Sequence, residues 1–596
     1  MKNKKELIIY IILVILILLT IVYLIINKTN KEKDNDIAID KITDIDTNVD
    51  LDNSDETINW DNYQTKDLTL TDSITITTGG IYNLSGTITD GMITVDTNDY
   101  VKLILNNVSI TNSSGPAIYV KKAKTVLIYL SDNSNNYLED SSNYSNYDED
   151  INATIYSKDD LVFDGTGSLT VKANYQDGIV SKDDLKIING NYTISSADDG
   201  IRGKDSVYII DGNFNISSLG DGIKSTNTED KDKGYILIEN GTFNIDATLD
   251  GIQAETKLII KNGNFTIKTG NGSTNSSKSN SNWGNWDSKN TTDAKSAKGL
   301  KAGSNIVIED GTFDLDTSDD AIHSNNYIGI IAGSYTISSG DDGVHADTEI
   351  IIDNGNIDIK ESYEGIEAAK ITINNGDIKI VASDDGINVA GGSDQSSMNR
   401  PGANNYNNNT TNILTINDGN IYVNTSGDGI DINGSGYIYG GTIIVDGSTS
   451  NGDGAIDYDG ELVVNGGSLI AAGSSGMVQG ISSNSTQYNA TIIFPNSYTG
   501  KKITITDENE NTILEYTPTK TYQAIIVSSS KLKKGTTYTI KIDNETYTSF
   551  TVSSISTTVG TSNRMNNGGN MPGNGENPNN GNEPAGKPNG NQPERK

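Results

Sequence analysis

Apolar and polar residues alternate in short runs through most of this 596-residue chain. Residues 213–216 and 264–267, for example, place an apolar side chain at every second position. A period of two is typical of β-strands, because neighbouring side chains of a strand point to opposite faces of a sheet. Asn-Gly and Asp-Gly dipeptides separate these runs and indicate tight turns. The pattern predicts many short strands.

One phrase recurs along the middle of the chain, most often at a spacing of 22 residues. It consists of Asp-Gly-Ile, an apolar strand, an Asn-Gly turn and a second strand with an aromatic residue or Ile. The first residues of the clearest copies are Asp177, Asp199, Asp221, Asp250, Asp320, Asp342, Glu364, Asp385, Asp428 and Asp453. Polar insertions at 270–297 and 391–412 account for the two larger gaps. A repeat of this length predicts a solenoid.

The β period decides between two kinds of solenoid. A leucine-rich repeat needs regular leucines and usually a helical segment, whereas these units alternate Ile, Val, Phe and Tyr. We therefore predict an all-β, right-handed parallel β-helix of about 22 residues per coil over residues 66–490, with stacked coils burying an Ile-rich interior. About fifteen coils at ~4.8 Å each predict a rod of about 70 Å.

Alternation also predicts which side chains face the interior. After each Asp-Gly, the Ile should point inward, and so should the small residue two positions later. The residue between them should point outward into solvent. This outward column is basic in the early coils and acidic in the late ones, and it holds the two histidines: Val180, Arg202, Lys224, Gln253, His323, His345, Glu367, Asn388 and Asp431.

The segments outside the repeat suggest the remaining organisation. Residues 7–26 are apolar apart from one Thr and are long enough to span a bilayer, with 1–6 as a cytoplasmic tail and 27–65 as an acidic tether. A cleaved signal peptide is the alternative, but no small-residue cleavage site follows. Residues 491–553 predict a small β unit that caps the last coil, and 554–596 a disordered Gly/Asn/Pro-rich tail.

Composition restricts the chemistry. Asp and Glu outnumber Lys and Arg by 79 to 44, giving a formal charge of −35, and there is no cysteine. Such an acidic surface disfavours nucleic acid and anionic membranes as partners. Disulfides, thiolate metal sites and a cysteine nucleophile are excluded.

The repeated acids predict a cation site. Coil repetition should stack the Asp residues about 5 Å apart, and stacked carboxylates repel one another unless they are protonated, paired or bridged. Ca²⁺ binds carboxylate and turn carbonyl oxygens, so at least one Ca²⁺ is predicted on this column. The alternative for any single Asp is a plain turn residue.

Two basic residues beside these acids offer a catalytic alternative. Arg202 or Lys224, next to carboxylate-bound Ca²⁺, could take the proton α to a uronate carboxyl, which is β-elimination. The alternative is that they neutralise the Asp column. His323 and His345 are 22 residues apart and should be stacked neighbours. They could bind a metal, or they could be chance members of a solvated column.

Two tryptophans suggest sugar contacts. Trp283 and Trp286 lie in a Gly/Ser/Asn-rich insertion that has no core of its own. Exposed aromatic rings stack on sugar rings, although these could also fold back onto the solenoid flank.

The repeat resembles a known family. Residues 115–123, 155–161, 177–185, 197–205 and 220–225 are similar to the carbohydrate-binding domain-containing proteins of anaerobic Gram-positive bacteria. These are cell-surface parallel β-helix proteins related in fold to pectate lyases. The resemblance implies Ca²⁺ and binding of cellulose or acidic, pectin-like sugars without established catalysis. The matching positions for Ca²⁺ are Asp159, Asp160, Asp177, Asp183, Asp184, Asp199 and Asp221.

These observations predict a Ca²⁺-stabilised, non-catalytic, monomeric polysaccharide-binding protein. Its bulk should be extracellular, on a single-pass membrane anchor formed by residues 7–26. The predicted sugar contacts are Trp283, Trp286, Arg202 and Lys224. Two alternatives stay open: a Ca²⁺-dependent polysaccharide lyase acting on polyuronates, and a structural or adhesive surface rod.

Overall fold

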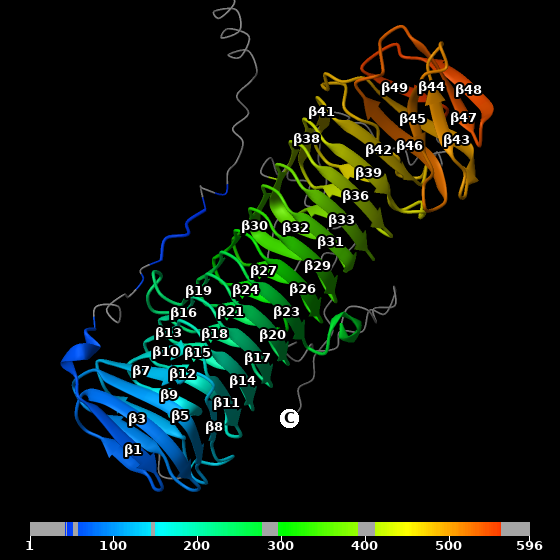
Figure 1. Ribbon diagram of the computed structural model, residues 1–596. Helices are drawn as coiled ribbons and strands as arrows, with labels where there is room; N and C mark the ends of the chain where they lie inside the picture. The colour runs from blue at the N-terminus through cyan, green and yellow to red at the C-terminus, as the bar shows by residue number, and fades with distance from the viewer. Residues whose placement is uncertain are drawn as a thin grey trace, which may run out of the picture.

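The computed structural model describes residues 42, 45–49, 51, 58–144, 150–276, 296–390 and 412–561. Within these ranges the protein is all-β, with only two short 3-10 helices, η3 (Trp60–Asn62) and η4 (Ser273–Asn275). Figure 1 shows a long rod of stacked coils. The predicted β-helix solenoid is confirmed, and its right-handed sense stays a prediction.

Each complete coil contributes one strand to each of three parallel sheets that run along the rod. A coil passes from sheet 3 to sheet 1 and then to sheet 2, as β12, β13 and β14 do. Sheet 1 consists of β1 (Thr65–Leu70), β3 (Gly80–Ile88), β5 (Val101–Thr111), β7 (Thr125–Leu130), β10 (Asp160–Gly165), β13 (Asp184–Ile187), β16 (Ser206–Ile209), β19 (Tyr235–Ile238), β22 (Lys257–Ile260), β25 (Asn305–Ile308), β28 (Tyr327–Ile330), β30 (Val344–Ile352), β32 (Ile366–Ile373), β35 (Ile413–Ile416), β38 (Ser435–Ile438) and β41 (Leu462–Val464).

The other two sheets share β5, β30 and β32 with sheet 1, because these strands are long enough to pair twice. Sheet 2 continues through β8 (Asn135–Glu139), β11 (Ser168–Ala173), β14 (Asn191–Ser196), β17 (Asn213–Ser218), β20 (Thr242–Ala247), β23 (Asn264–Thr269), β26 (Thr312–Thr317), β29 (Ser334–Ser339), β31 (Asn356–Glu361), β33 (Asp377–Ala382), β36 (Asn420–Thr425), β39 (Thr442–Asp446) and β42 (Ser468–Gly473). Sheet 3 consists of β2 (Ile74–Ile76), β4 (Ile93–Asp96), β6 (Ile118–Lys122), β9 (Ala153–Ser157), β12 (Asp177–Ser181), β15 (Ile201–Gly203), β18 (Ile223–Ser225), β21 (Ile252–Ala254), β24 (Leu300–Ala302), β27 (Ile322–Ser324), β34 (Ile387–Val389), β37 (Ile430–Ile432) and β40 (Ile456–Tyr458), with β30 and β32 between β27 and β34.

Identical side chains stack on one another inside the rod. The Ile of each Asp-Gly-Ile triplet is buried, and so are the small residues two positions on, such as Ser225 and Ala254. Sheet 2 adds a column of stacked aromatic rings whose centroids are 4.7–5.1 Å apart, formed by Tyr192, Phe214, Phe243, Phe265, Phe313 and Tyr335. Parallel in-register pairing produces this column, because equal positions of successive coils face each other.

Part of the segment predicted as a tether instead packs on the rod. Ile42 and Ile45 are buried against Val307 and Ile351 on the outer face of sheet 1. Val49 and Leu51 pack farther toward the N-terminal end of the rod, against strands β19 and β22. We call the described residues between 42 and 51 the N-terminal strap, which runs beside the rod in Figure 1.

Polar contacts fix the strap to sheet 1. The Lys257 ammonium donates to the Asp46 carboxylate at 2.7 Å and to the Asn48 carbonyl oxygen at 2.8 Å. The Asn305 amide donates to the Asp46 carbonyl oxygen at 3.0 Å. The strap therefore covers apolar side chains that a β-helix would otherwise expose.

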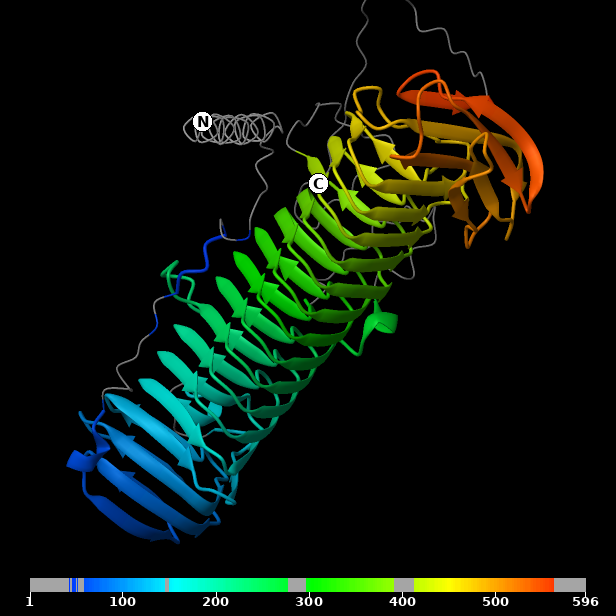
Figure 2. The same ribbon diagram turned by 45° about the horizontal axis from the view of Figure 1, so that its top comes forward.

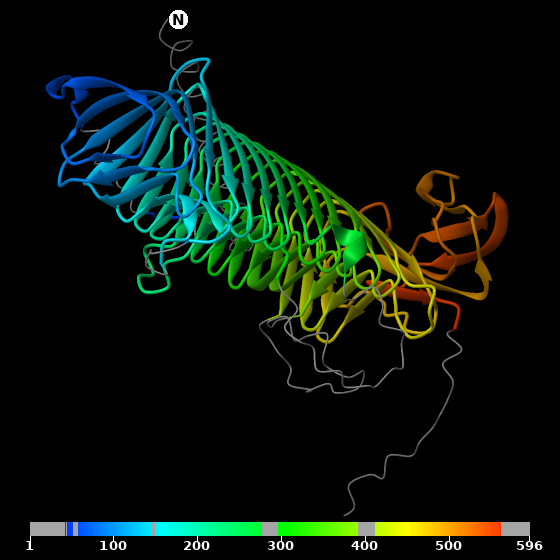
Figure 3. The same cartoon turned by 90° about the horizontal axis from the view of Figure 1, so that it is seen from below.

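A C-terminal β unit follows the last coil. It contains β43 (Asn489–Tyr498), β44 (Ile503–Thr506), β45 (Thr512–Tyr516), β46 (Tyr522–Ser529), β47 (Thr537–Ile542), β48 (Glu545–Thr551) and β49 (Ser556–Val559). Strand β46 pairs antiparallel with β42, so it occupies the edge of sheet 2 that would otherwise be open. Figures 2 and 3 show this unit, in orange and red, at the end of the rod opposite to β1.

Among the described residues, no helix is long and apolar enough to cross a membrane. The anchor predicted at 7–26, with the tail at 1–6, lies outside those residues, as does 562–596 of the predicted disordered tail.

The aromatic column can be tested by truncation. Phe243→Ala removes a fully buried ring that stacks on Phe214 and Phe265. We expect the free energy of unfolding to fall by about 3–5 kcal/mol, because the rigid coil cannot close the cavity. Guanidinium denaturation monitored by circular dichroism measures this loss.

The control is Thr242→Ala on the same strand, whose side chain is exposed. It should change the free energy of unfolding by less than about 0.5 kcal/mol. Equal losses in the two variants would mean that the column does not stabilise the rod.

Candidate functional site

A column of carboxylates runs along sheet 3, buried from Asp177 to Glu364 and half-buried at Asp385 and Asp428. Its members are the acids that begin each Asp-Gly-Ile triplet. We call it the aspartate column, and its described members are Asp177, Asp199, Asp221, Asp250, Asp320, Asp342, Glu364, Asp385 and Asp428. Asp177, Asp221 and Asp320 expose at most 1% of their surface.

The Oδ1 of each aspartate from Asp177 to Asp428 accepts a hydrogen bond from a backbone N–H of the next coil. The Asp199 amide N–H donates to Asp177 Oδ1 at 3.0 Å, and the Asp221 N–H to Asp199 Oδ1 at 2.9 Å. The same bond recurs from Asp342 to Asp320 and from Asp428 to Asp385. These acids are therefore more than turn residues, because they join neighbouring coils.

The second carboxylate oxygen faces the side chain three residues later. We call these side chains the counter column; they are the residues predicted to point outward. Lys224 Nζ lies 2.5 Å from Asp221 Oδ2, and His323 Nδ1 lies 2.8 Å from Asp320 Oδ2. The acid and its partner are at positions i and i+3 of the chain. This spacing brings the two side chains together on the same side of the coil.

The counter column is not the solvated face that the alternation predicted. His323 is 4% exposed, His345 1% and Glu367 2%. These side chains do lie outside the apolar core of the rod, as predicted. They are nevertheless buried, since they bond to the aspartate column. The two histidines are neighbours in register with ring centroids 5.0 Å apart, as predicted.

Arg202 and Lys224 neutralise the early aspartate column. Arg202 lies 2.5 Å from Asp177 Oδ2 and 3.7 Å from Asp199 Oδ2. Burial lowers the pKa of Lys224, but Asp199 and Asp221 outweigh burial and raise this pKa above its ordinary value. A lysine with a raised pKa is a poor base near neutral pH. The geometry therefore favours the charge-neutralising role over the catalytic one.

The late coils carry acids in both columns. Glu367 takes the place of a cation beside Glu364, and Asp431 does so beside Asp428. Burial and then neighbouring carboxylates raise the pKa of Asp428 and of Asp431 to about 7. Burial, followed by Asp431 and other acids, also raises the pKa of Asp385 well above its usual range. The late coils therefore lack the internal cations of the early coils.

A second group of acids lies at the bend between sheets 3 and 1. Asp160, Asp183 and Asp184 hold carboxylate oxygens within 4.8 Å of one another and are half-buried. Burial, followed by Asp205, raises the pKa of Asp183 to about 6. Asp159 is engaged separately, because its Oδ2 accepts the Ala123 amide N–H at 2.9 Å. The structure thus brings three of the predicted Ca²⁺ residues into one cluster.

The outer face of sheet 2 is a continuous polar surface. From β14 to β29 the outward residues are in register and exposed, apart from the half-buried Asn191, Asp316 and Ser338. The central row consists of Thr193, Asn215, Asn244, Thr266, Asp314 and Thr336. Amides bridge some coils, as where Asn244 donates to Asn215 Oδ1 at 2.9 Å. Sequence reasoning missed this face, although the exposed positions between the aromatic residues and Ile carried the signal.

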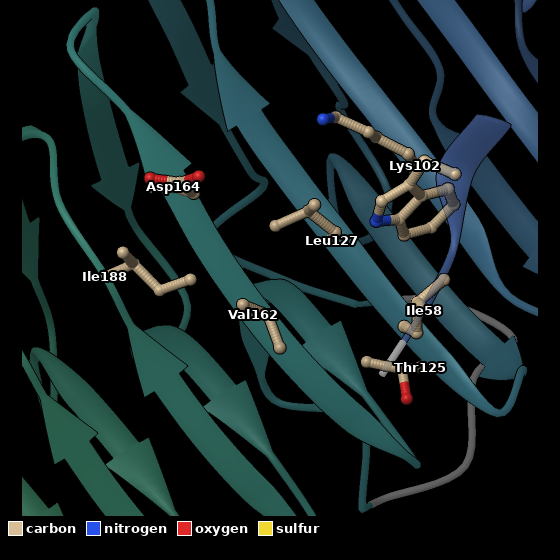
Figure 4. Close-up of a pocket in the computed structure, with 8 residues that line it drawn as sticks. Ile58, Lys102, Thr125, Leu127, Val162, Asp164 and Ile188 are labelled. Atoms are coloured by element: carbon tan, nitrogen blue, oxygen red, sulfur yellow. The ribbon is translucent and has the colours of Figure 1, made fainter. Parts of the chain in front are cut away.

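A cavity of about 250 Å³ lies where the chain after the strap crosses sheet 1. Figure 4 shows Ile58, Lys102, Leu127, Val162 and Asp164 around it. Ligand pockets usually hold about 300–1,000 Å³. This cavity, whose lining is half aliphatic and half polar or aromatic, is therefore small for a polysaccharide. Trp283 and Trp286, the predicted sugar contacts, lie outside the described residues.

Comparisons with known proteins point to one family. A sequence model for carbohydrate-binding domain-containing proteins matches residues 71–343. A protein of that description from Acetivibrio thermocellus is 51% identical over 167 residues, which cover 27% of this chain and 58% of the relative. The chain therefore spans little more than half the length of that relative. The resemblance inferred from the repeat is confirmed.

A solved structure is also similar in sequence. It is described as the polysaccharide lyase-like protein from C. thermocellum, in a gadolinium derivative. It is 40% identical, covers 33% of this chain and 82% of its own, and superposes with a TM-score of 0.33.

The acid pairs of the late coils should make stability depend on pH. Burial, followed by Asp428 and other acids, raises the pKa of Asp431 to about 7 in the folded chain, whereas an aspartate in the unfolded chain has a pKa near 4. Between these values the folded chain holds the extra proton, so stability falls as pH rises from about 4 to about 7 and stays at its lower level above that. Asp431→Asn removes this charge, and we expect it to raise the melting temperature at pH 8 but hardly at pH 5. Thermal unfolding in the presence of chelator, at pH 5 and at pH 8, measures these melting temperatures.

Asp246→Asn, which alters an exposed carboxylate on sheet 2, is the control and should not change the melting temperature differently at the two pH values. An equal gain for Asp431→Asn at pH 5 and pH 8 would contradict the assignment.

Proposed function

Because residues 71–343 carry the sequence of a carbohydrate-binding domain, we propose that this chain binds polysaccharide along the outer face of sheet 2. The observation that best supports this proposal is the regular polar surface from β14 to β29, which lies wholly within the matched residues. Its amides and hydroxyls recur at every coil, ~4.8 Å apart. A glycan lying along the rod would meet hydrogen-bonding groups repeatedly.

Small side chains make this face suitable for a long polymer. Asn, Thr and Ser dominate the three exposed rows, and none of the described exposed positions from β14 to β29 is aromatic. Each single hydrogen bond adds only about 0.5–1.5 kcal/mol. Affinity would therefore grow with the number of coils that a chain covers, which favours polymers over short sugars.

The charges on the face distinguish two classes of polysaccharide. Lys268 is the cation of the third row and lies 3.5 Å from Asp316, while Asp246 and Asp314 carry further negative charge. A neutral glucan such as cellulose needs no counterion on this face. An acidic, pectin-like polymer would need Ca²⁺ to bridge the carboxylates. We therefore propose a neutral glucan as the first choice and a polyuronate with Ca²⁺ as the second.

We assign structural Ca²⁺ to Asp160, Asp183 and Asp184. Three clustered carboxylates suit a cation that takes six to eight oxygen ligands. Asp177, Asp199 and Asp221 suit it less well, because Arg202 and Lys224 already balance their charge. Ca²⁺ at the triplet would neutralise acids that otherwise repel one another.

We also propose that the protein is displayed outside the cell as a monomer, with residues 7–26 as its membrane anchor. Non-catalytic binding agrees with the engagement of Arg202 and Lys224 in ion pairs. The lyase alternative requires an unsaturated product, and the adhesive-rod alternative requires that no glycan binds.

The first experiment tests the sheet 2 face with Asn215→Glu/Asn244→Glu. We expect retention on cellulose to weaken by tenfold or more, since two adjacent coils lose neutral hydrogen-bonding groups and gain charge. Depletion assays on cellulose and on polygalacturonate, with Ca²⁺ and with chelator, measure retention. The supernatant is assayed for unsaturated uronates.

Asn509→Glu/Thr512→Glu in the C-terminal unit is the matched control, because both residues are exposed and lie outside the proposed face. Equal retention of the two double variants would reject the face. Release of unsaturated uronates would favour the lyase alternative. If the unaltered protein is not retained on either polymer, the adhesive rod is the alternative that remains.

The Ca²⁺ assignment has a separate test. Asp183→Asn/Asp184→Asn should weaken Ca²⁺ binding by tenfold or more in isothermal titration and abolish the rise in melting temperature that Ca²⁺ gives. Asp211→Asn, a turn carboxylate outside the triplet, should leave both unchanged. Unaltered Ca²⁺ affinity in the double variant would refute the assignment.

A further inference from the structure

Three carboxylates converge on one ring nitrogen at the middle of the aspartate column. His345 Nδ1 lies 3.0 Å from Asp342 Oδ2, 3.6 Å from Glu367 Oε2 and 4.0 Å from Asp320 Oδ2. The four residues come from three successive coils, on β27, β30 and β32 or just before them. All four side chains expose 5% or less of their surface.

A single proton on His345 Nδ1 cannot form hydrogen bonds to all three carboxylates. A proton on Nδ1 forms one hydrogen bond, to the nearest oxygen of Asp342, and leaves the Glu367 oxygen beyond hydrogen-bond distance. A metal ion placed among the ligand atoms would instead attract every one of them. Zn²⁺ binds nitrogen and carboxylate oxygen at about 2.0–2.2 Å, so its ligand atoms lie about 3–4 Å apart. The distances from His345 Nδ1 to the Asp342 and Glu367 oxygens, 3.0 and 3.6 Å, match that spacing, and all three ligand atoms lie within 4.8 Å of one another.

We propose that Asp342, His345 and Glu367 bind a divalent transition-metal ion of the zinc class. Asp320 is not assigned as a ligand, because its Oδ2 already faces the Lys298 ammonium at 2.6 Å and His323 Nδ1 at 2.8 Å. An imidazole nitrogen among the ligands selects zinc, cobalt or nickel over Ca²⁺, which prefers oxygen alone. The site is thus distinct in chemistry and place from the Asp160–Asp183–Asp184 triplet.

The residues around the site orient its ligands. His345 Nε2 lies 3.6 Å from Asp347 Oδ1, so the ring has a carboxylate on the side away from the proposed metal. At 3.6 Å this is a charge contact and not a hydrogen bond, and it places a carboxylate on the outer side of the ring, as is common for metal-binding histidines. The Asn388 amide donates to Glu364 Oε2 at 2.6 Å and lies 3.5 Å from Glu367 Oε1. That contact leaves Glu367 Oε2 facing His345.

A further buried polar atom lies beside the cluster. Asn388 is 6% exposed, and its Oδ1 has no hydrogen-bond partner among the described residues. Asn388 is in register with Glu367 on the neighbouring strand. An amide oxygen left over next to two glutamates is consistent with a cation in this part of the column.

His323 is not assigned as a ligand. Its Nδ1 lies 2.8 Å from Asp320 Oδ2 and its Nε2 lies 3.0 Å from Asn325 Oδ1, so both ring nitrogens already have oxygen partners. His323 is therefore a matched control for His345, since it is buried in the same column one coil away.

Cobalt provides a direct test, because its visible ligand-field bands report coordination by nitrogen in a site of low symmetry. The full chain, purified in non-ionic detergent and stripped with chelator, is titrated with Co²⁺ in excess Ca²⁺, which occupies sites made of oxygen alone. We expect one Co²⁺ per chain with visible bands, displaced by Zn²⁺. His345→Gln and Glu367→Gln should each weaken binding by a hundredfold or more, while His323→Gln should change it by less than tenfold.

Circular dichroism establishes that each variant is folded, and Glu367→Gln tests the site even if His345→Gln does not fold. Absence of Co²⁺ bands in the unaltered protein would overturn the proposal. Bands that Ca²⁺ removes, or that persist in Glu367→Gln with unchanged affinity, would overturn it as well.

Discussion

From Asp177 to Asp428, the hydrogen bond that a backbone N–H of the next coil donates to each aspartate of the column is the contact on which the other features of sheet 3 depend. It sets the register, because a slip by one residue would separate every Oδ1 from its N–H at once. It also places a buried or half-buried carboxyl group in each coil of the column, and a buried charge must be neutralised, protonated or bridged. The counter column supplies the neutralising groups, which are Arg202 and Lys224 in the early coils and the two histidines in the middle coils.

This constraint separates the inner chemistry from the binding surface. Arg202 and Lys224, the cations of the early coils, form ion pairs with the aspartate column within sheet 3, so they are poorly placed to contact a sugar. Sheet 2 buries no ionised side chain from β14 to β29, since its inward positions are aromatic or aliphatic residues and a row of small residues, mostly Ser and Thr such as Ser218 and Thr269. Its outward positions are therefore free to vary. The polymer-binding face that we propose and the cation sites therefore lie on different sides of the same coil.

Much of the fold follows from the sequence because its signals are local and repeated. The alternation, the Asp-Gly turns and the spacing of 22 residues predicted the coil, the buried Ile and the stacking of His323 on His345. Burial of the counter column was not predictable, because alternation shows which way a side chain leaves the strand and not what it bonds to. The same limit applies to Ile42 and Ile45, whose partners lie more than 260 residues away in the chain. Sequence also placed the Ca²⁺ residues in one set, whereas the geometry divides Asp160, Asp183 and Asp184 from those paired with basic residues.

The N-terminal strap has a mechanical consequence. The chain reaches the rod beside strands β25 to β30, runs back along sheet 1 and begins its first coil at the far end. A pull on the N-terminal residues would thus load the rod near its middle. The contacts of Ile42 and Ile45 would yield first, then the Lys257 bonds, then Val49 and Leu51, one after another. Such stepwise peeling would lengthen the molecule under tension while every coil stays wound.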